Sequence, residues 1–429
     1  MLQTFRKAFQ IEDIRRKILY TLAMLFVVRL GSQLPTPGVD PTYIQNFFAN
    51  QTGDSFNFFN AFTGGSFETM SIFALSITPY ITSSIIMQLM TIAIPKLEEM
   101  QKEGEDGRKK IAEYTRYLTV ALALFQSSAM AIGFGKQGLL YEDAQNVWGY
   151  MTVIAAMTAG SALLMWIGER ITEKGVGNGI SIVLLINIVS SLPQDVLMLY
   201  ERFMAGKSVA VATVAAIIVL AVVVATVVFV LVLNGAERRI PVQYAKKVVG
   251  RKVYGGQSTF LPIKVTMSGV MPVIFASAIL SIPSTIRLFV GEPTGFWKGF
   301  FNAFSSTGWL YSVLYLLLIV VFAYFYMTIQ YNPIEMANNL RTNNGTIPGI
   351  RPGRPTAEFI SKILSKITLI GAIFLAFVAI LPILYSNLTG MYGLSMGGTS
   401  VIIMVGVALE TVKQIESQMM MRHYKGFLD

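Results

Sequence analysis

GAERRIPVQYAKKVVGRKVYGGQSTFLPIK, residues 235–264, is a basic stretch that lies between two long apolar segments, 209–233 and 267–290. It contains seven Lys and Arg residues and a single acid, Glu237. A basic loop of this length between apolar segments is either a topology signal of a membrane protein or a docking surface for a large partner. Its charge alone leaves both interpretations open.

The composition places the whole chain in a lipid bilayer. Hydrophobic residues make up 53% of the 429 positions and charged residues 14%, whereas an ordinary soluble domain has about 25% charged residues. Apolar runs long enough to cross about 30 Å of hydrocarbon as a helix recur along the chain, and they lack the alternation of barrel strands. We therefore predict an all-α polytopic membrane protein with ten transmembrane helices, at 18–34, 71–94, 116–135, 149–169, 180–200, 209–233, 267–290, 309–331, 367–386 and 399–419.

The distribution of basic residues predicts the orientation. With ten spans, 28 of the 34 Lys and Arg residues fall on the face that holds both termini. Because cytoplasmic loops carry the excess of Lys and Arg, both termini are predicted to be cytoplasmic. A missing or extra span in the middle of the chain would abolish this asymmetry, so the asymmetry also supports the even count.

Several kinds of chemistry are excluded by residue types. The chain has no cysteine, and its one histidine is His423 in the C-terminal tail. Thiolate or His-based metal sites and Ser-His triads therefore cannot be built, and the phosphate-binding GxxxxGK[ST] motif is missing. We predict no catalytic, metal or cofactor site, and hence a protein that is not an enzyme.

An ion-coupled secondary transporter of a small solute is the alternative. Prolines interrupt several spans, at Pro79, Pro272, Pro283 and Pro382, as they do in the broken helices of transporters. Ionisable residues inside the spans are few, and Arg29 and Glu410 are among them. The interrupted spans carry apolar residues where a transporter needs charge. Spans two, five, seven and ten offer Ile77, Ile81, Ile180, Leu184, Ile274 and Ile403 instead. Pattern alone does not separate a pore lining from ordinary core packing at these positions.

Two other segments have unusual composition. FNFFNAFTGGSFETM, residues 56–70, is too short to span a membrane and too apolar to stay in water, so it is either a buried re-entrant half-helix or an interfacial loop. YNPIEMANNLRTNNGTIPGIRPGRPT, residues 331–356, frames Arg351 and Arg354 with prolines. Because proline restricts the backbone, these arginines are held out as a stiff basic tip that suits a protein or RNA partner.

Several motifs make the chain resemble the SecY family over essentially its full length. They are SIFALSITPYITSSIIMQLM at 71–90, ITEKGVGNGISIV at 171–183, the basic loop at 234–265, GVMPVIFASAIL at 269–280, NPIEMANNLR at 332–341, GIRPGRPTAEFI at 349–360 and GGTSVIIMV at 397–405. SecY proteins are the channel-forming subunits of the bacterial-type protein translocase. The resemblance implies a passive channel for unfolded secretory preproteins, with signal peptides recognised and apolar segments released sideways into membrane lipid.

The resemblance also implies an architecture and sites. Ten helices are expected in two pseudo-symmetric halves of five, with a ring of aliphatic side chains at the waist, which we call the ring: Ile77, Ile81, Ile180, Leu184, Ile274 and Ile403. A re-entrant plug half-helix is expected at 55–69, including Asn60, Phe62, Gly64 and Gly65, where the glycines permit close packing and a hinge. A lateral gate is expected between the second and third and the seventh and eighth helices, with Ser84, Gln88, Gln126 and Thr266 as candidate polar contacts.

The expected partners bind the basic cytoplasmic loops or the membrane-embedded surface. The family's SecA motor ATPase or the translating ribosome is expected to dock on Arg238, Arg239, Lys246, Arg251, Lys252, Arg351 and Arg354, and small SecE- and SecG-like membrane subunits are expected to accompany the chain. The predicted organisation is a cytoplasmic amphipathic segment at 1–17, an N-terminal half at 18–200, helix six with the basic loop at 201–266, helices seven to ten at 267–419 with a cytoplasmic loop at 332–360, and a cytoplasmic tail at 420–429.

Overall fold

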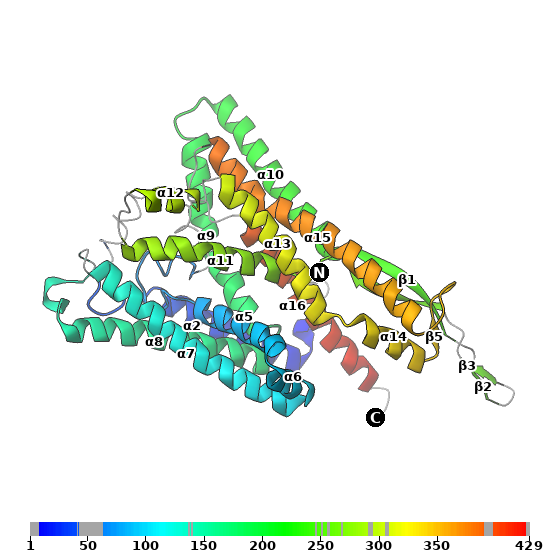
Figure 1. Ribbon diagram of the computed structural model, residues 1–429. Coiled ribbons are helices and arrows are strands. Elements are labelled where there is room, and N and C mark those ends of the chain that lie inside the picture. Colours follow the sequence, from blue (N-terminus) through cyan, green and yellow to red (C-terminus); the bar gives the residue numbers. More distant parts are fainter. Residues whose placement is uncertain are drawn as a thin grey trace.

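A computed structural model describes most of the chain. The described residues are 8–40, 42, 63–135, 138, 140–244, 247–249, 252–254, 258–266, 269–290, 295–304, 309–389 and 398–425. The molecule is built mainly of helices that run together as a bundle, with strands extending from one end (Figure 1).

Each of the ten predicted spans contains a helix, which confirms the ten-helix architecture. These helices are α2 (Glu12–Gly31), α5 (Thr78–Ala93), α7 (Glu105–Gly135), α8 (Val147–Lys174), α9 (Gly179–Phe203), α10 (Val209–Gly235), α11 (Met271–Val290), α13 (Trp309–Gln330), α15 (Arg354–Thr389) and α16 (Gly398–Lys425). Within the described residues, six helices qualify as spans by length and hydropathy alone, or seven if α5 is joined to α6 (Pro95–Lys102), from which it is bent by 101°. Length and hydropathy together leave out α2, because its first turns carry charged residues such as Glu12 and Asp13.

The prolines do not interrupt the helices as the sequence predicted. Pro79 lies in the first turn of α5 and Pro272 in the first turn of α11, where a missing backbone N–H costs no helical hydrogen bond. Pro283 lies inside α11, and α15 is one helix from Arg354 to Thr389 that includes Pro382. Of the predicted span 71–94, only the part from Thr78 is helical, and residues 64–77 form successive turns.

The helices contact one another in two groups that follow the chain order. In the first group α2 and α9 pack on α8, α8 packs on α7, and α7 packs on α5; in the second, α13 packs on α11 and α15, and α16 packs on α10 and α15. The groups meet where α9 contacts α10 and α16 and where α2 contacts α16, and again where α7 contacts α11. The second meeting place joins the third and seventh predicted spans, which the resemblance assigns to opposite sides of the lateral gate.

The two basic loops form one antiparallel sheet, which the sequence analysis did not predict. The order is β4 (Ser258–Lys264), β1 (Glu237–Tyr244), β5 (Gly345–Thr346), so β5 from the second loop pairs with β1 from the first. β1 buries Ile240 and Val242, two residues apart, as expected for alternating faces of a strand. A separate hairpin of β2 (Lys247–Val249) and β3 (Lys252–Tyr254) projects beyond this sheet (Figure 1).

The strands mark one end of the molecule. α14 (Pro333–Thr342) lies beside the sheet, whereas α12 (Phe296–Ala303) lies at the opposite end of the bundle (Figure 1). The side chain of Asn332 caps α14 by accepting from the backbone N–H groups of Ile334 and Glu335. The short 3₁₀ helix η1 (Glu142–Ala144) precedes α8.

Candidate functional site: an aliphatic cluster beside a cavity

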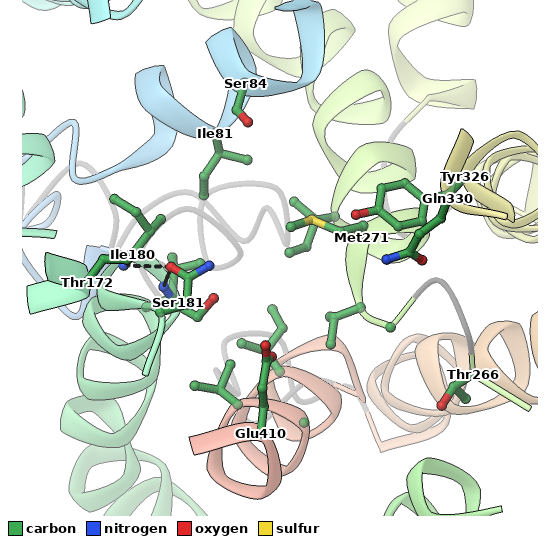
Figure 2. A pocket seen from close by; sticks show the side chains of 18 of the residues that line it. Ile81, Ser84, Thr172, Ile180, Ser181, Thr266, Met271, Tyr326, Gln330 and Glu410 are labelled. Carbon is green, nitrogen blue, oxygen red and sulfur yellow. Dashed lines mark hydrogen bonds between the residues drawn. The ribbon is translucent and has the colours of Figure 1, made fainter. Parts of the chain in front are cut away.

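A cavity of about 1030 Å³ lies between the two groups of helices. Figure 2 shows Ile81 of α5, Ile180 of α9, Met271 of α11 and Glu410 of α16 surrounding it. Its lining combines five of the ring positions with charged side chains, namely Arg116, Glu169, Glu173, Lys264, Glu410 and Lys413. β4 supplies Pro262 and Lys264 to this lining, so the cavity extends from the aliphatic ring residues to the sheet.

All six predicted ring residues belong to one apolar cluster. Ile77, Leu184, Ile274 and Ile403 are buried members, and Ile81 and Ile180 are partly buried residues packed against them. Five of the six line the cavity, and Ile77 has no exposed surface. The four helices that supply them, α5, α9, α11 and α16, come from both groups, so the structure gathers at one place residues spread over more than 300 positions of sequence.

Local structure brings the first four of these residues into the cluster. Ile77 immediately precedes α5 and Ile81 lies one turn later, while Ile180 and Leu184 are one turn apart near the start of α9. Residues four apart lie on the same helical face. Asn178 caps α9 by accepting from the backbone N–H groups of Ile180 and Ser181, which sets the first turn of that helix.

The described part of the predicted plug, from Thr63 onward, is buried or half-buried and is held by hydrogen bonds. Gly64 adopts a left-handed φ of 65°, and its carbonyl oxygen accepts hydrogen bonds from Arg29 Nη1 at 3.2 Å and Ser190 Oγ at 3.4 Å. A Cβ on Gly64 would lie 2.8–2.9 Å from Arg29, Asn187 and Ser190, whereas one on Gly65 would meet nothing within 4 Å. Asn60 and Phe62 lie outside the described residues.

The candidate gate residues bond locally. Gln88 donates to Ser84 on the same helix, α5, at 3.4 Å, and Thr266 donates to Asn234 Oδ1, at the end of α10, at 3.2 Å. Ser84, Gln88 and Thr266 line the cavity, while half-buried Gln126 of α7 does not. Within the described residues, none of these four side chains bonds across the meeting place of α7 and α11, so a contribution to the gate stays a prediction.

The predicted docking arginines lie together at the sheet end. Arg238 and Arg239 lie on exposed positions of β1, and Arg239 pairs with Glu237 at 2.7 Å. Exposed Arg351 lies between β5 and α15, and exposed Arg354 begins α15, where it pairs with Glu358 at 3.2 Å. Thr356 Oγ1 donates to the Arg351 carbonyl oxygen at 2.8 Å, which fixes the backbone of the tip.

Three of the predicted docking residues have no described side chain. Lys246 and Arg251 lie outside the described residues. Lys252 lies on β3, where only its backbone is described. The pairing of β1 with β5 nevertheless brings the two basic loops to one surface.

Sequence reasoning missed a buried polar group beside the ring. Asn187 of α9 donates to Ser76 Oγ at 3.1 Å, and Ser161 of α8 donates to the Ser76 carbonyl oxygen at 3.2 Å. An asparagine inside the apolar run 180–200 was the available signal, because a polar side chain buried among apolar helices needs a partner.

Known proteins resemble the chain over nearly its whole length. The SecY family model matches residues 71–412. "Protein translocase subunit SecY" of Streptomyces galbus is 45% identical over 446 residues, covering 100% of both chains. The protein of the same name from Thermus thermophilus is 44% identical over 433 residues, covering 100% of this chain and 98% of the relative.

Solved channel structures share the fold. "The structure of a protein conducting channel" aligns with a TM-score of 0.60 at 16% identity, over 94% of this chain and 92% of that one. "Sec61 in the Canine ribosome-channel complex from the endoplasmic reticulum" aligns with a TM-score of 0.57 at 16% identity, over the same shares. The fold, the family match and the full-length relatives agree: this chain is a multi-pass membrane protein that belongs to the SecY family.

Proposed function

We propose that this chain is the central pore subunit of a protein-conducting channel that moves unfolded secretory preproteins across the plasma membrane. The observation that carries the proposal is the apolar cluster of the ring beside the 1030 Å³ cavity. A cluster of aliphatic side chains suits a passing polypeptide, because it holds no charged group that would retain one cargo side chain. The family match gives no support to the transporter alternative.

The ring has two tasks in this proposal. Ile77, Ile81, Ile180, Leu184, Ile274 and Ile403 close around the chain in transit, and when the channel is empty they dewet and slow the passage of ions. Aliphatic side chains fit both tasks, since they are deformable and form no hydrogen bonds with cargo. Residues 63–69 belong to the proposed plug, and Phe67 among them packs in a separate apolar cluster with residues of α7 and α8.

Sideways release of apolar segments uses the place where α7 meets α11. Interhelical polar contacts within membranes contribute only about 0.6–2 kcal/mol each. A signal peptide that buries aliphatic side chains gains about 1.5–3 kcal/mol for each. A hydrophobic substrate therefore competes effectively with the contacts that close such a seam, and Ser84, Gln88, Gln126 and Thr266 are the candidate polar residues on its two sides.

The sheet end of the molecule is the proposed cytoplasmic face, with both termini on that side. Its exposed arginines, Arg238, Arg239, Arg351 and Arg354, form the surface on which a SecA-type motor ATPase or a translating ribosome docks. A guanidinium group binds either a carboxylate or an RNA phosphate in bidentate fashion, so the same surface serves both partners. Small SecE- and SecG-like subunits complete the complex in the membrane.

Reconstitution tests this function. Vesicles that hold the chain and its small subunits should import a radiolabelled preprotein only when SecA and ATP are added, and import should require the signal peptide. The transporter alternative demands uptake of a small solute along an ion gradient without any partner, abolished by Glu410→Gln. Such uptake, together with no import of preprotein, would refute the channel.

A further inference from the structure

We propose that Asn187 is a positioning residue for the ring, because its hydrogen bond to Ser76 fixes the turn that precedes α5 against α9. The inference rests on the proposed function, since it concerns how tightly the constriction closes. It assigns a role to a polar group in the first five helices that lines no part of the cavity.

The polar group is small and almost completely buried. Ser76, Ser161 and Asn187 are 1–2% exposed. Asn187 Nδ2 donates to Ser76 Oγ at 3.1 Å, and Ser161 Oγ donates to the Ser76 carbonyl oxygen at 3.2 Å. Both the side chain and the backbone of Ser76 are thus bound, one from α9 and the other from α8.

The conformation of Ser76 indicates that these bonds maintain a constrained backbone. Its backbone φ is 51°, in the left-handed region that residues other than glycine rarely adopt. A residue stays in such a conformation when the surrounding structure holds it there. The approach of α8 is also close, since a Cβ on Gly160 would lie 2.1 Å from the carbonyl oxygen of Ile72.

Both ends of the Asn187–Ser76 bond lie next to ring residues. Ser76 directly precedes Ile77, which has no exposed surface and comes immediately before α5. Asn187 follows Leu184 by three residues on α9, so the two lie on adjacent positions of the same helical face. The bond therefore links two ring residues indirectly. Its Ser76 end is one residue from Ile77, and its Asn187 end is about one helical turn from Leu184.

A double-mutant cycle separates positioning from general loss of stability. The variants are Asn187→Ala, Ser76→Gly and the combination, each purified with its small subunits and reconstituted in vesicles. Ser76→Gly removes the hydroxyl while glycine adopts the left-handed φ freely, so this variant keeps its backbone. Asn187→Ala also removes other contacts of Asn187, and the cycle isolates the part that acts through Ser76.

Two measurements report on the ring. The first is the ion leak of the resting channel, which we expect to rise about tenfold in either single variant, in line with the loss of one buried hydrogen bond. The second is the rate at which a water-soluble maleimide labels a cysteine placed at Ile77, in a chain that has no other cysteine. This rate should rise in parallel, because a displaced α5 start exposes position 77.

The outcomes decide the inference. If Asn187 acts through Ser76, the double variant leaks about as much as the single variants, not a hundredfold more. Additive effects, or wild-type leak and labelling in Asn187→Ala, would overturn the positioning role. Ser127→Ala is the matched control, because it removes a buried bond of the same kind to Thr158, at 2.9 Å between α7 and α8, and should leave the leak unchanged. Failure of the wild-type vesicles to import preprotein would instead refute the proposed function.

Discussion

Arg29 donates from Nη1 to the carbonyl oxygen of Gly64 at 3.2 Å, so a charged side chain inside the first predicted span binds the turns that lead into α5. A Cβ on Gly64 would lie too close to atoms of Arg29, Asn187 and Ser190, whereas a Cβ on the neighbouring Gly65 would have free space around it. The two glycines therefore have different tasks, although both adopt a left-handed φ. Gly64 permits close approach of α2 and α9, and only Gly65 has room for a hinge.

This difference predicts unequal effects of two adjacent substitutions. Gly64→Ala and Gly65→Ala each incur about 1–2 kcal/mol for a left-handed alanine, and Gly64→Ala adds about 1–3 kcal/mol of overpacking. The thermal unfolding midpoint of the purified complex should fall further for Gly64→Ala than for Gly65→Ala. Equal midpoints would contradict the packing role of Gly64.

Polar substitution in the ring should loosen closure. Ile81→Asn and Ile403→Asn place amide groups in the apolar cluster from opposite halves of the molecule, which favours water in the constriction. We expect a larger resting ion leak and export of reporters whose signal peptides carry a defective apolar core. Ile81→Leu and Ile403→Leu keep the ring aliphatic and serve as controls; unchanged leak and unchanged signal stringency in the Asn variants would refute the ring assignment.

Charge reversal at the basic tip should disconnect the channel from its motor. Arg351→Glu reverses an exposed charge beside the sheet, so SecA-driven import should be abolished while the protein stays inserted and folded. Arg341→Glu reverses another exposed arginine, in the last turn of α14, and is the matched control. Full import by Arg351→Glu, measured with the reconstituted system, would remove the docking role.

The shared sheet should be sensitive to its buried residues. Ile240 of β1 is 3% exposed, whereas Phe260 of β4 is 58% exposed. Ile240→Ala should therefore destabilise the sheet by about 2–5 kcal/mol and admit protease at 237–264, while Phe260→Ala should leave cleavage near the wild-type rate. If both variants resist the protease alike, the stability of β1 does not depend on the burial of Ile240.

The ten helices could be predicted because lipid demands long apolar segments, and that demand is visible in sequence. The sheet could not, because β1 buries only Ile240 and Val242 in a stretch that otherwise reads as a charged loop. Its pairing with β5 joins segments about a hundred residues apart, and such pairing leaves no local periodicity.

The ring shows a different limit. Residues such as Ile77 and Ile274 look like any other buried aliphatic residue, and their sequence pattern left pore lining and core packing unresolved. Family resemblance named them, and the structure brings them into one cluster. Asn187 and Ser76 escaped notice because a polar pair is recognised only when its two members are seen in contact.

Site-specific crosslinking tests the central claim most directly. A photoreactive amino acid is placed at Ile81 or Ile274, on opposite halves beside the cavity, or at Leu220, a 65% exposed position of α10 that serves as the control. With a preprotein stalled during import, irradiation should link the cargo to positions 81 and 274 and not to position 220. Adducts at position 220 with none at 81 or 274 would show that the polypeptide does not pass through this constriction.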